Sequence, residues 1–201
     1  MKIVVSTKNN HKVQELKKML NMPEIELYTM SDCGLDLDIE ENGNTFEENA
    51  MIKAKALYKV LNDKSTIVIA DDSGLCVDAL NGKPGIFSAR YSGGDSKANN
   101  EKLLNELKNV KPLERGAHFV CSIAVVTDGV EKNFTGKCYG LIDKEEHGEN
   151  GFGYDPLFYF PATQKTFAEM TADEKDKVSH RANAVKLLKE WLEKINESNH
   201  L

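Results

Sequence analysis

Apolar runs rich in β-branched residues alternate with amphipathic helical patterns along this chain. Residues 2–6 have the pattern of a buried strand, and a polar loop separates them from a helix that carries Val13, Leu16 and Leu20 on one face. Residues 66–70 form a second short β-branched run, which we expect to end at Asp71-Asp72-Ser73-Gly74. Such interleaving of strands and helices predicts an α/β fold.

Further patterns extend this arrangement. Thr-x-x-Glu spacing, typical of a capping box, occurs at Thr45 and again at Thr171, and each predicts the start of a helix. Asp128-Gly129 suits a tight turn, so residues 119–126 and the segment from Val130 onward are expected to form a hairpin. The remaining helices are expected around two apolar sets: Leu103, Leu104, Leu107 and Val110, then Ala182, Val185, Leu188, Leu192 and Ile195. A hairpin among interleaved strands predicts a mixed β-sheet flanked by helices.

Length and composition exclude several classes of protein. The 201 residues suffice for one domain over residues 1–201, which can fold as two lobes around a shared sheet. No apolar run approaches the roughly 20 residues of a membrane span. The four cysteines lie far apart without a CxxC pair, so we expect reduced thiols in a cytoplasmic protein. A net charge of −6 argues against nucleic-acid binding but is compatible with a nucleotide substrate, since local lysines and a metal can neutralise a triphosphate.

The loop after the first strand is a candidate anion site. Thr7-Lys8-Asn9-Asn10 leads into a helix whose N-terminus offers free N–H groups and the positive end of its dipole. Lys12, in the first helical turn, can reach a phosphate. An Asn in this position also serves as an ordinary N-cap, and the loop lacks the glycines of a Walker A motif.

Two acidic pairs are candidate metal ligands. Asp71-Asp72 follows a buried strand, where adjacent carboxylates are costly unless they bind a cation or act as a base. Glu40-Glu41 is the second pair, and together the pairs offer the oxygen ligands that Mg²⁺ prefers. A turn stabilised by Asp hydrogen bonds explains the first pair equally well.

Two later segments suit a planar ligand. Aromatic residues alternate with glycines over residues 151–158, so that a ring can stack on a base and Asp155 can accept hydrogen bonds from its edge. A glycine-rich turn with aromatics in the core is the alternative. Lys175, with Ser179-His180-Arg181, places donors at the start of the last helix, although such groups are often merely solvated. Lys53 lies near the apolar stripe of its helix, where a lysine either extends to solvent or meets an anion.

Together these motifs resemble the inosine triphosphate pyrophosphatases, also described as XTP/dITP diphosphatases. The resemblance runs in order along nearly the full chain. Its blocks are residues 6–15, 40–43, 45–50 with Lys53, 70–75, 84–91, 151–158 and 171–181.

The resemblance implies an enzyme that hydrolyses non-canonical purine nucleoside triphosphates (ITP, dITP and XTP) to the monophosphate and pyrophosphate. It implies a homodimer, an elongated mixed sheet in two lobes with the active site in the cleft between them, and a Mg²⁺ cofactor that Mn²⁺ can replace. Glu40 and Asp72 would hold the metal, and Asp72 would also accept the proton of the attacking water. Ser73 would touch the phosphates.

The resemblance also assigns the substrate contacts. The triphosphate would be held by Thr7, Lys8, Asn9, Asn10, His11, Lys12 and Lys53. The base would be enclosed by Phe152, Gly153, Tyr154, Asp155, Lys175, His180 and Arg181. Many relatives have glycine at the position of Lys8, which implies a backbone contact there.

Two other functional classes remain open from the sequence. A phosphatase with a covalent aspartyl intermediate would use Asp71 or Asp72 as its nucleophile, but the Asp-x-Asp that such enzymes carry after the first strand is absent here. A nucleotide sensor would bind without turnover. A trapped phospho-aspartate would identify the first, and the absence of pyrophosphate release the second.

Overall fold

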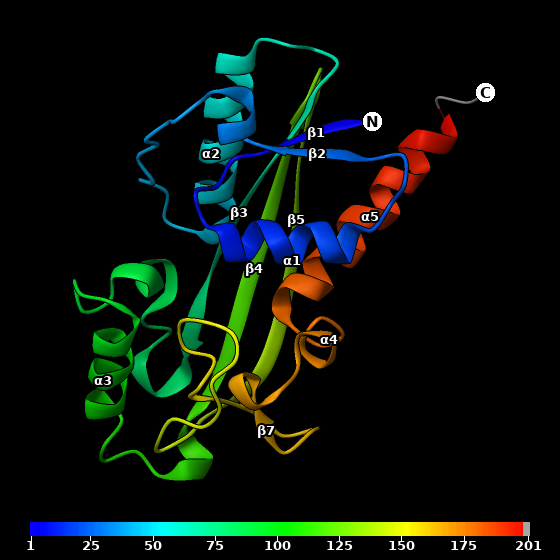
Figure 1. Cartoon of the computed structure of the whole chain (residues 1–201). Coiled ribbons are helices and arrows are strands. Elements are labelled where there is room, and N and C mark those ends of the chain that lie inside the picture. Colours follow the sequence, from blue (N-terminus) through cyan, green and yellow to red (C-terminus); the bar gives the residue numbers. More distant parts are fainter. Residues whose placement is uncertain (199–201) are drawn as a thin grey trace. The chain divides into compact units, whose positions relative to one another are not determined.

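The computed structural model describes residues 1–198, which form a seven-stranded sheet with helices around it (Figure 1). The sheet order is β2-β1-β3-β4-β5-β6-β7. Strand β1 pairs in parallel with β2 and β3, whereas β6 pairs antiparallel with β5 and β7. The predicted α/β fold with a mixed sheet is therefore confirmed.

The elements follow one another along the chain as the sequence predicts, with short 3₁₀ turns between them. The strands are β1 (Lys2–Val5), β2 (Glu26–Thr29), β3 (Ile67–Val77), β4 (Gly116–Thr127), β5 (Val130–Ile142), β6 (Phe158–Phe160) and β7 (Lys165–Thr166). The helices are α1 (Asn10–Leu20), α2 (Phe46–Leu61), α3 (Ser96–Glu106), α4 (Ala172–Lys175) and α5 (His180–Ser198).

Two of the predicted boundaries are wrong. Strand β3 does not end at Ala70 but continues through Asp71 and Asp72 to Val77. The β-branched run stops at residue 70, but the polar residues stay extended because their neighbours supply charged partners, described below. Helix α3 ends at Glu106, so Leu107, which is its C-cap, and Val110 lie beyond it, and both pack against the apolar core.

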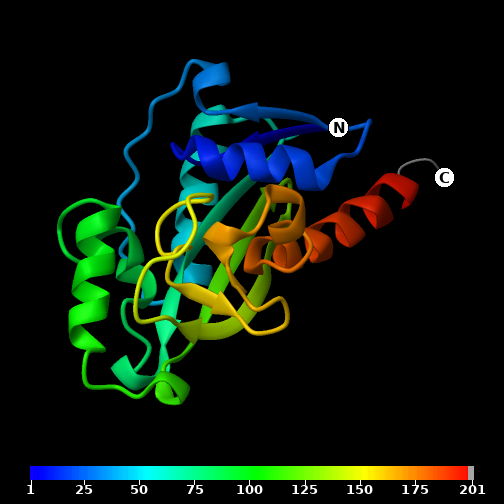
Figure 2. The same ribbon diagram turned by 60° about the horizontal axis from the view of Figure 1, so that its bottom comes forward.

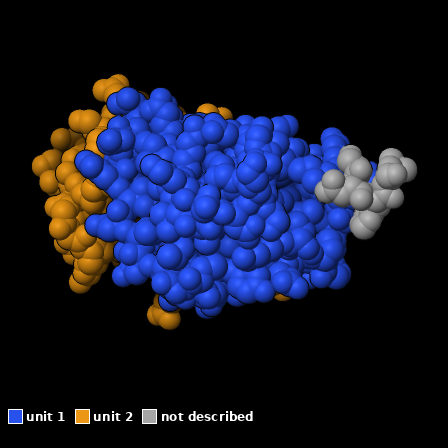
Figure 3. Space-filling view, turned by 90° about the horizontal axis from the view of Figure 1, so that it is seen from above, with its two compact units in different colours: residues 1–72, 121–136, 181–201 blue, residues 73–120, 137–180 orange. Residues whose placement is uncertain are grey.

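The chain divides into two compact units (Figure 3). Unit 1 comprises residues 1–72, 121–136 and the segment from 181 onward, and unit 2 comprises residues 73–120 and 137–180. Strands β3, β4 and β5 each contribute residues to both units. That residues 1–201 form a single functional domain stays a prediction.

Unit 1 packs helices on both faces of its strands. Alternate strand residues such as Ile3 and Ile69 share a core with Leu16 of α1 and Leu188 of α5. The intervening strand residues share a second core with Leu57 of α2 and its alanines. In Figure 1, α1 crosses in front of these strands. This alternation follows from the period of two along a strand, which directs successive side chains to opposite faces.

Unit 2 has an aromatic core. Phe119 of β4 lies against Phe158 of β6 and Phe167, with ring centroids 4.7 and 5.9 Å away. Leu103 of α3 and Tyr154 join the same core. Figure 2 shows the segment around residue 150 (yellow), which follows β5 and leads into β6, over the strands of this unit. Of the aromatic residues of the 151–158 motif, Tyr154 and Phe158 are buried, whereas Phe152 is half-buried.

Two further sequence expectations can be compared with the structure. All four cysteines are free thiols, and two of them, Cys121 and Cys138, are buried. Within residues 1–198, no helix combines the length and apolar character needed to cross a membrane.

Shortening a buried side chain of α2 should destabilise unit 1. Leu57 is fully buried, so Leu57→Ala is expected to lower the free energy of unfolding by about 2–5 kcal/mol, measured by urea denaturation. Val60 lies in the same helix and is 49% exposed, so Val60→Ala is the matched control and should change stability by only about 0.5 kcal/mol. Equal effects of the two changes would contradict the packing described here.

Candidate active site

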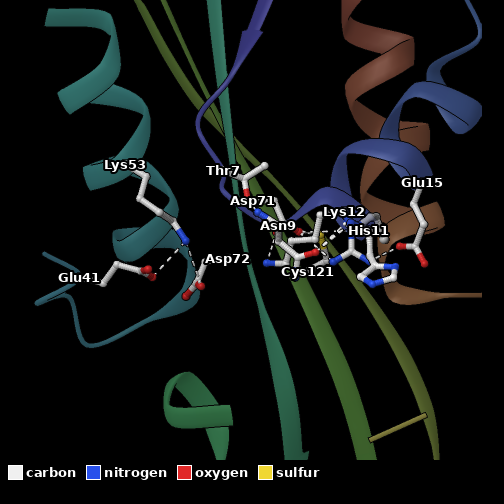
Figure 4. Close-up of polar contacts among 11 residues, drawn as sticks. Thr7, Asn9, His11, Lys12, Glu15, Glu41, Lys53, Asp71, Asp72 and Cys121 are labelled. Carbon is white, nitrogen blue, oxygen red and sulfur yellow. Dashed lines mark hydrogen bonds and ion pairs between the residues drawn. The ribbon is translucent and has the colours of Figure 1, made fainter. Parts of the chain in front are cut away.

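The two adjacent aspartates of β3 point to opposite faces of the sheet (Figure 4). Asp71 continues the series of Ile67 and Ile69 and meets α1 and α5, whereas Asp72 continues the series of Val68 and Ala70 and meets α2. Both carboxylates are largely buried, at 3% and 9% exposed. Strand geometry therefore separates the like charges, and each carboxylate finds its own cations.

Asp71 lies within a buried network of charges. It forms an ion pair with Lys12 of α1 and accepts hydrogen bonds from Nε and Nη2 of Arg181 at 3.4 and 3.2 Å. The Cys121 thiol of β4 donates to the same Oδ2 at 3.0 Å. Arg181, 1% exposed, also pairs with Glu15 of α1. Each buried charge of this network has an opposite charge beside it, which is what keeps it compatible with burial.

Asp72 belongs to a second group on the α2 face. The Lys53 ammonium lies 3.2 Å from Asp72 Oδ1 and 3.0 Å from Glu41 Oε2 (Figure 4). Burial raises the pKa of Asp72 to about 6, while Lys53 and Lys12 act in the opposite direction. The other oxygen, Oδ2, is buried and has no hydrogen-bond partner among the described residues. Such an oxygen suits a metal ion or a water proton.

The acidic pair at residues 40–41 contributes unequally. Glu41 contacts Lys53, whereas Glu40 is exposed. Asn49 holds the loop that carries them, because its Oδ1 accepts a hydrogen bond from the Gly43 N–H at 2.8 Å. A Cβ at Gly43 would lie 2.7 Å from Glu48 Cβ, so only glycine allows this approach. Among residues 1–198, no three His, Cys, Asp or Glu side chains form a metal cluster.

The loop before α1 is organised by its own side chains. Asn9 is the N-cap of α1, and its Oδ1 accepts from the N–H groups of His11 and Lys12 at 3.0 and 3.3 Å. Thr7 Oγ1 accepts from the Asn9 N–H at 3.1 Å. The Lys8 side chain instead pairs with Asp36 at 2.8 Å. Asn9 therefore acts as an N-cap. This role is compatible with the predicted anion site, because the cap fixes the loop beside Lys12.

Unit 2 contains a separate group of polar and aromatic residues. Asp155 Oδ2 accepts from Lys175 Nζ at 2.6 Å and from the Phe152 N–H at 2.9 Å. The Lys175 ammonium lies 4.9 Å from the centre of the Phe152 ring. The His180 ring stacks on Phe119 at 4.7 Å. A carboxylate, an ammonium and aromatic faces are thereby held together by packing.

Close backbone contacts fix the 151–155 loop. Gly151 has φ 74°, and a Cβ there would lie 2.1 Å from Asp155 Oδ2. Tyr154 is buried, and its hydroxyl donates to the Ser88 carbonyl at 2.8 Å. Asn100 Nδ2 donates to the Gly153 carbonyl at 3.2 Å. Tyr154 is therefore held in the core, and the contact with the base that the family resemblance implies for it stays a prediction.

The structure brings together some of the predicted site residues. Lys53 and Asp72 meet in unit 1, as do Lys12 and Arg181 around Asp71. The boundary between the two compact units lies between His180 and Arg181, so these two of the predicted base contacts belong to different units. Ser73 is the first residue of unit 2. Assigning these residues to a nucleotide stays a prediction.

Sequence reasoning missed several residues of these groups. The sequence did not predict that Asp71 acts as a counter-ion, that Glu41 pairs with Lys53, or that Cys121 donates a hydrogen bond. The alternation along β3 would have separated Asp71 from Asp72 if the strand had been extended beyond Ala70. Nothing in the sequence pattern pairs Cys121 with Asp71, which lie 50 residues apart.

Comparison with known proteins identifies the family. Residues 3–191 match the Ham1 family. The chain belongs to the Ham1 family. Its fold agrees closely with that of a Ham1 protein from Staphylococcus aureus, at a TM-score of 0.87 and 46% identity over 96% of this chain and 99% of that one. A Ham1 protein from Coxiella burnetii gives the same TM-score at 37% identity, over the same shares of the two chains.

Relatives within the Ham1 family carry more specific names. A dITP/XTP pyrophosphatase from Clostridium perfringens is 52% identical over 96% of this chain and 98% of its own length. A protein of the same name from Bacillus subtilis is 47% identical over 94% of this chain and 96% of its own. The similarity therefore extends along nearly the whole of each protein, and the resemblance to the XTP/dITP diphosphatases is confirmed.

The charge environment of Asp72 predicts an unusual titration. In metal-free protein, the Asp72 carboxylate is expected to titrate near pH 6, as followed by ¹³C NMR of the side chain. Lys53→Met removes a cation 3.2 Å away that favours the ionised form, so the pKa of Asp72 should rise further.

Lys55→Met is the control for this titration. Lys55 lies in the same helix but pairs with the exposed Glu131, so the pKa of Asp72 should stay near 6 in that variant. An Asp72 pKa near that of a solvated aspartate in the metal-free protein would show that the site is more hydrated than described.

Proposed function

We propose that this protein hydrolyses non-canonical purine nucleoside triphosphates, namely ITP, dITP and XTP, to the monophosphate and pyrophosphate. The reaction removes these nucleotides from the cytoplasmic pool. The observation that carries the proposal is the near full-length similarity to dITP/XTP pyrophosphatases, at up to 52% identity among the relatives described above. The grouping of Asp72, Lys53 and Glu41 adds chemical support, because it supplies the groups that hydrolysis at phosphorus needs.

The residues of unit 1 suit a triphosphate and a divalent metal. Asp72 Oδ2 is a buried oxygen without a hydrogen-bond partner among the described residues, and Glu40 is the second metal ligand we propose. Two carboxylates suffice for Mg²⁺, which usually keeps several waters. When bound, Mg²⁺ or Mn²⁺ neutralises phosphate charge. Lys12 and Lys53 add positive charge, with the loop at residues 7–12 beside the phosphates.

Asp72 is the proposed general base. Its pKa of about 6 leaves it ionised at neutral pH yet basic enough to accept a proton from the attacking water. Water then attacks the α-phosphorus, the bond to the bridging oxygen breaks, and pyrophosphate leaves. Lys53, 3.2 Å from the same carboxylate, orients it. No covalent intermediate is needed, so the aspartyl-phosphate alternative is not favoured.

The residues proposed for the purine base lie in unit 2, apart from Arg181, which belongs to unit 1. Hypoxanthine and xanthine present a keto oxygen at position 6 and an N–H at position 1. We propose that Lys175, His180 and Arg181 donate to the keto oxygen, and that Asp155 or a backbone carbonyl accepts the N–H, with Phe152 against the ring. Adenine has an amino group and a bare acceptor at these positions, so it would leave two or so buried groups unpaired.

A panel of nucleotides tests this proposal. With Mg²⁺, ITP, dITP and XTP should yield pyrophosphate and the monophosphate, while ATP should react with a kcat/KM lower by roughly 30-fold to 10⁴-fold, at about 1–3 kcal/mol for each unpaired group. Asp72→Asn should reduce turnover by at least about 10²-fold, because a base contributes 10²–10⁴ and a metal ligand is lost as well.

Three results would contradict the proposal. The first is stoichiometric orthophosphate with a nucleoside diphosphate, and the second is full activity in excess chelator. The third is turnover by Asp72→Asn within about threefold of the unaltered protein, far from the expected range. Lys55→Met is a suitable control, since this exposed lysine of α2 pairs with Glu131 rather than with Asp72.

We also propose that the protein is a homodimer. The support is the family resemblance together with the predominance of two-fold dimers among soluble oligomers. Light scattering at micromolar concentration should give twice the chain mass of 22.4 kDa. A mass equal to that of one chain would reject the dimer while leaving the catalytic proposal intact.

A further inference from the structure

We propose that Asp71 is a positioning residue that couples phosphate binding at Lys12 to base binding at Arg181. The inference rests on the proposed function, which assigns those two cations to the two ends of one nucleotide. Asp71 itself would touch neither the phosphates nor the base. Its role would be to share one negative charge between the two cations.

The contacts of Asp71 support this role. Lys12 pairs with Oδ1, while Nε and Nη2 of Arg181 donate to Oδ2 at 3.4 and 3.2 Å. Asp71 is 3% exposed and Arg181 1% exposed, whereas the Lys12 side chain is 16% exposed. Of the two cations, Lys12 is thus the one that an incoming anion can reach while the carboxylate stays covered.

The direction of Asp71 separates it from the proposed metal chemistry. Asp71 meets α1 and α5, whereas Asp72 points to the α2 face with Lys53. The Cys121 thiol also donates to Asp71 Oδ2 and fixes the carboxylate from β4. Asp71 is therefore committed to protein donors, and its chemistry is that of an internal counter-ion.

A shared buried carboxylate couples its cations through charge. Electrostatic attraction is weakly screened away from water, so Lys12 and Arg181 compete for the same negative charge. When a polyphosphate draws Lys12 away, more of that charge acts on Arg181 and holds its guanidinium more firmly. Arg181 is then better ordered to meet a base. By linkage, base binding must strengthen phosphate binding by the same factor.

Glu15 provides a matched control. It pairs with Arg181 Nη1 from α1, so it shares one cation with Asp71. Changing either acid to its amide removes one negative charge beside Arg181. Asp71, in addition, forms the ion pair with Lys12. Glu15→Gln should therefore weaken base binding without removing the coupling, whereas Asp71→Asn should remove the coupling itself.

The experiment separates the two ends of the substrate. Tripolyphosphate is a polyphosphate without a base, and inosine is a base without a phosphate. The dissociation constant of inosine is measured by NMR titration of the metal-free full chain, with and without saturating tripolyphosphate. Inosine should bind at least about fivefold more tightly with tripolyphosphate present, the lower end of usual coupling factors. The ratio should fall to about one in Asp71→Asn and persist in Glu15→Gln.

A spectroscopic measurement on the unaltered protein gives a second test. The Nε–H resonance of Arg181 should shift when tripolyphosphate binds, although that ligand carries no base. This measurement decides the question even if Asp71→Asn fails to fold. An unmoved Arg181 resonance, an inosine ratio near one in the unaltered protein, or a ratio retained in Asp71→Asn would each overturn the coupling. Failure of tripolyphosphate to bind at all would instead overturn the proposed function, and the coupling with it.

Discussion

Two aspartates that are neighbours in one buried strand set the main electrostatic constraint on unit 1. Adjacent carboxylates can be buried only if their charges are separated and compensated. The pleat of β3 supplies the separation, and lysine or arginine side chains on both faces of the sheet supply the compensation. Ion pairs as well as apolar packing therefore hold helices α1, α2 and α5 against the strands.

This constraint also explains how one strand can serve different chemistry on its two faces. On the α2 face, burial keeps the pKa of Asp72 near 6 and leaves one carboxylate oxygen available for a metal or a water. On the other face, Asp71 is surrounded by Lys12, Arg181 and Cys121, which hold it in place. Strand geometry thus places the proposed catalytic residue and the proposed positioning residue on opposite faces of the sheet.

In unit 2, the main structural requirement is to hold aromatic side chains in a fixed arrangement. Its glycine-rich loop approaches Asp155 so closely that a Cβ at Gly151 would clash, and the loop is tied to neighbouring segments through Tyr154 and Asn100. The aromatic residues of the 151–158 motif therefore have different contacts. Tyr154 anchors the loop within the core, and Phe152 keeps contact with Lys175.

The sequence by itself determined the fold class, most element positions and the residue types of the candidate site. Periodicity of apolar residues, capping boxes and the Asp-Gly turn are local properties, and the family resemblance rests on ordered motifs. Tertiary structure alone decided that β3 continues past Ala70, that Glu41 contacts Lys53, and that Asp71 joins Lys12, Arg181 and Cys121. These facts depend on contacts between distant residues, such as Asp71 and Arg181, which lie 110 positions apart, and local patterns carry no record of such partners.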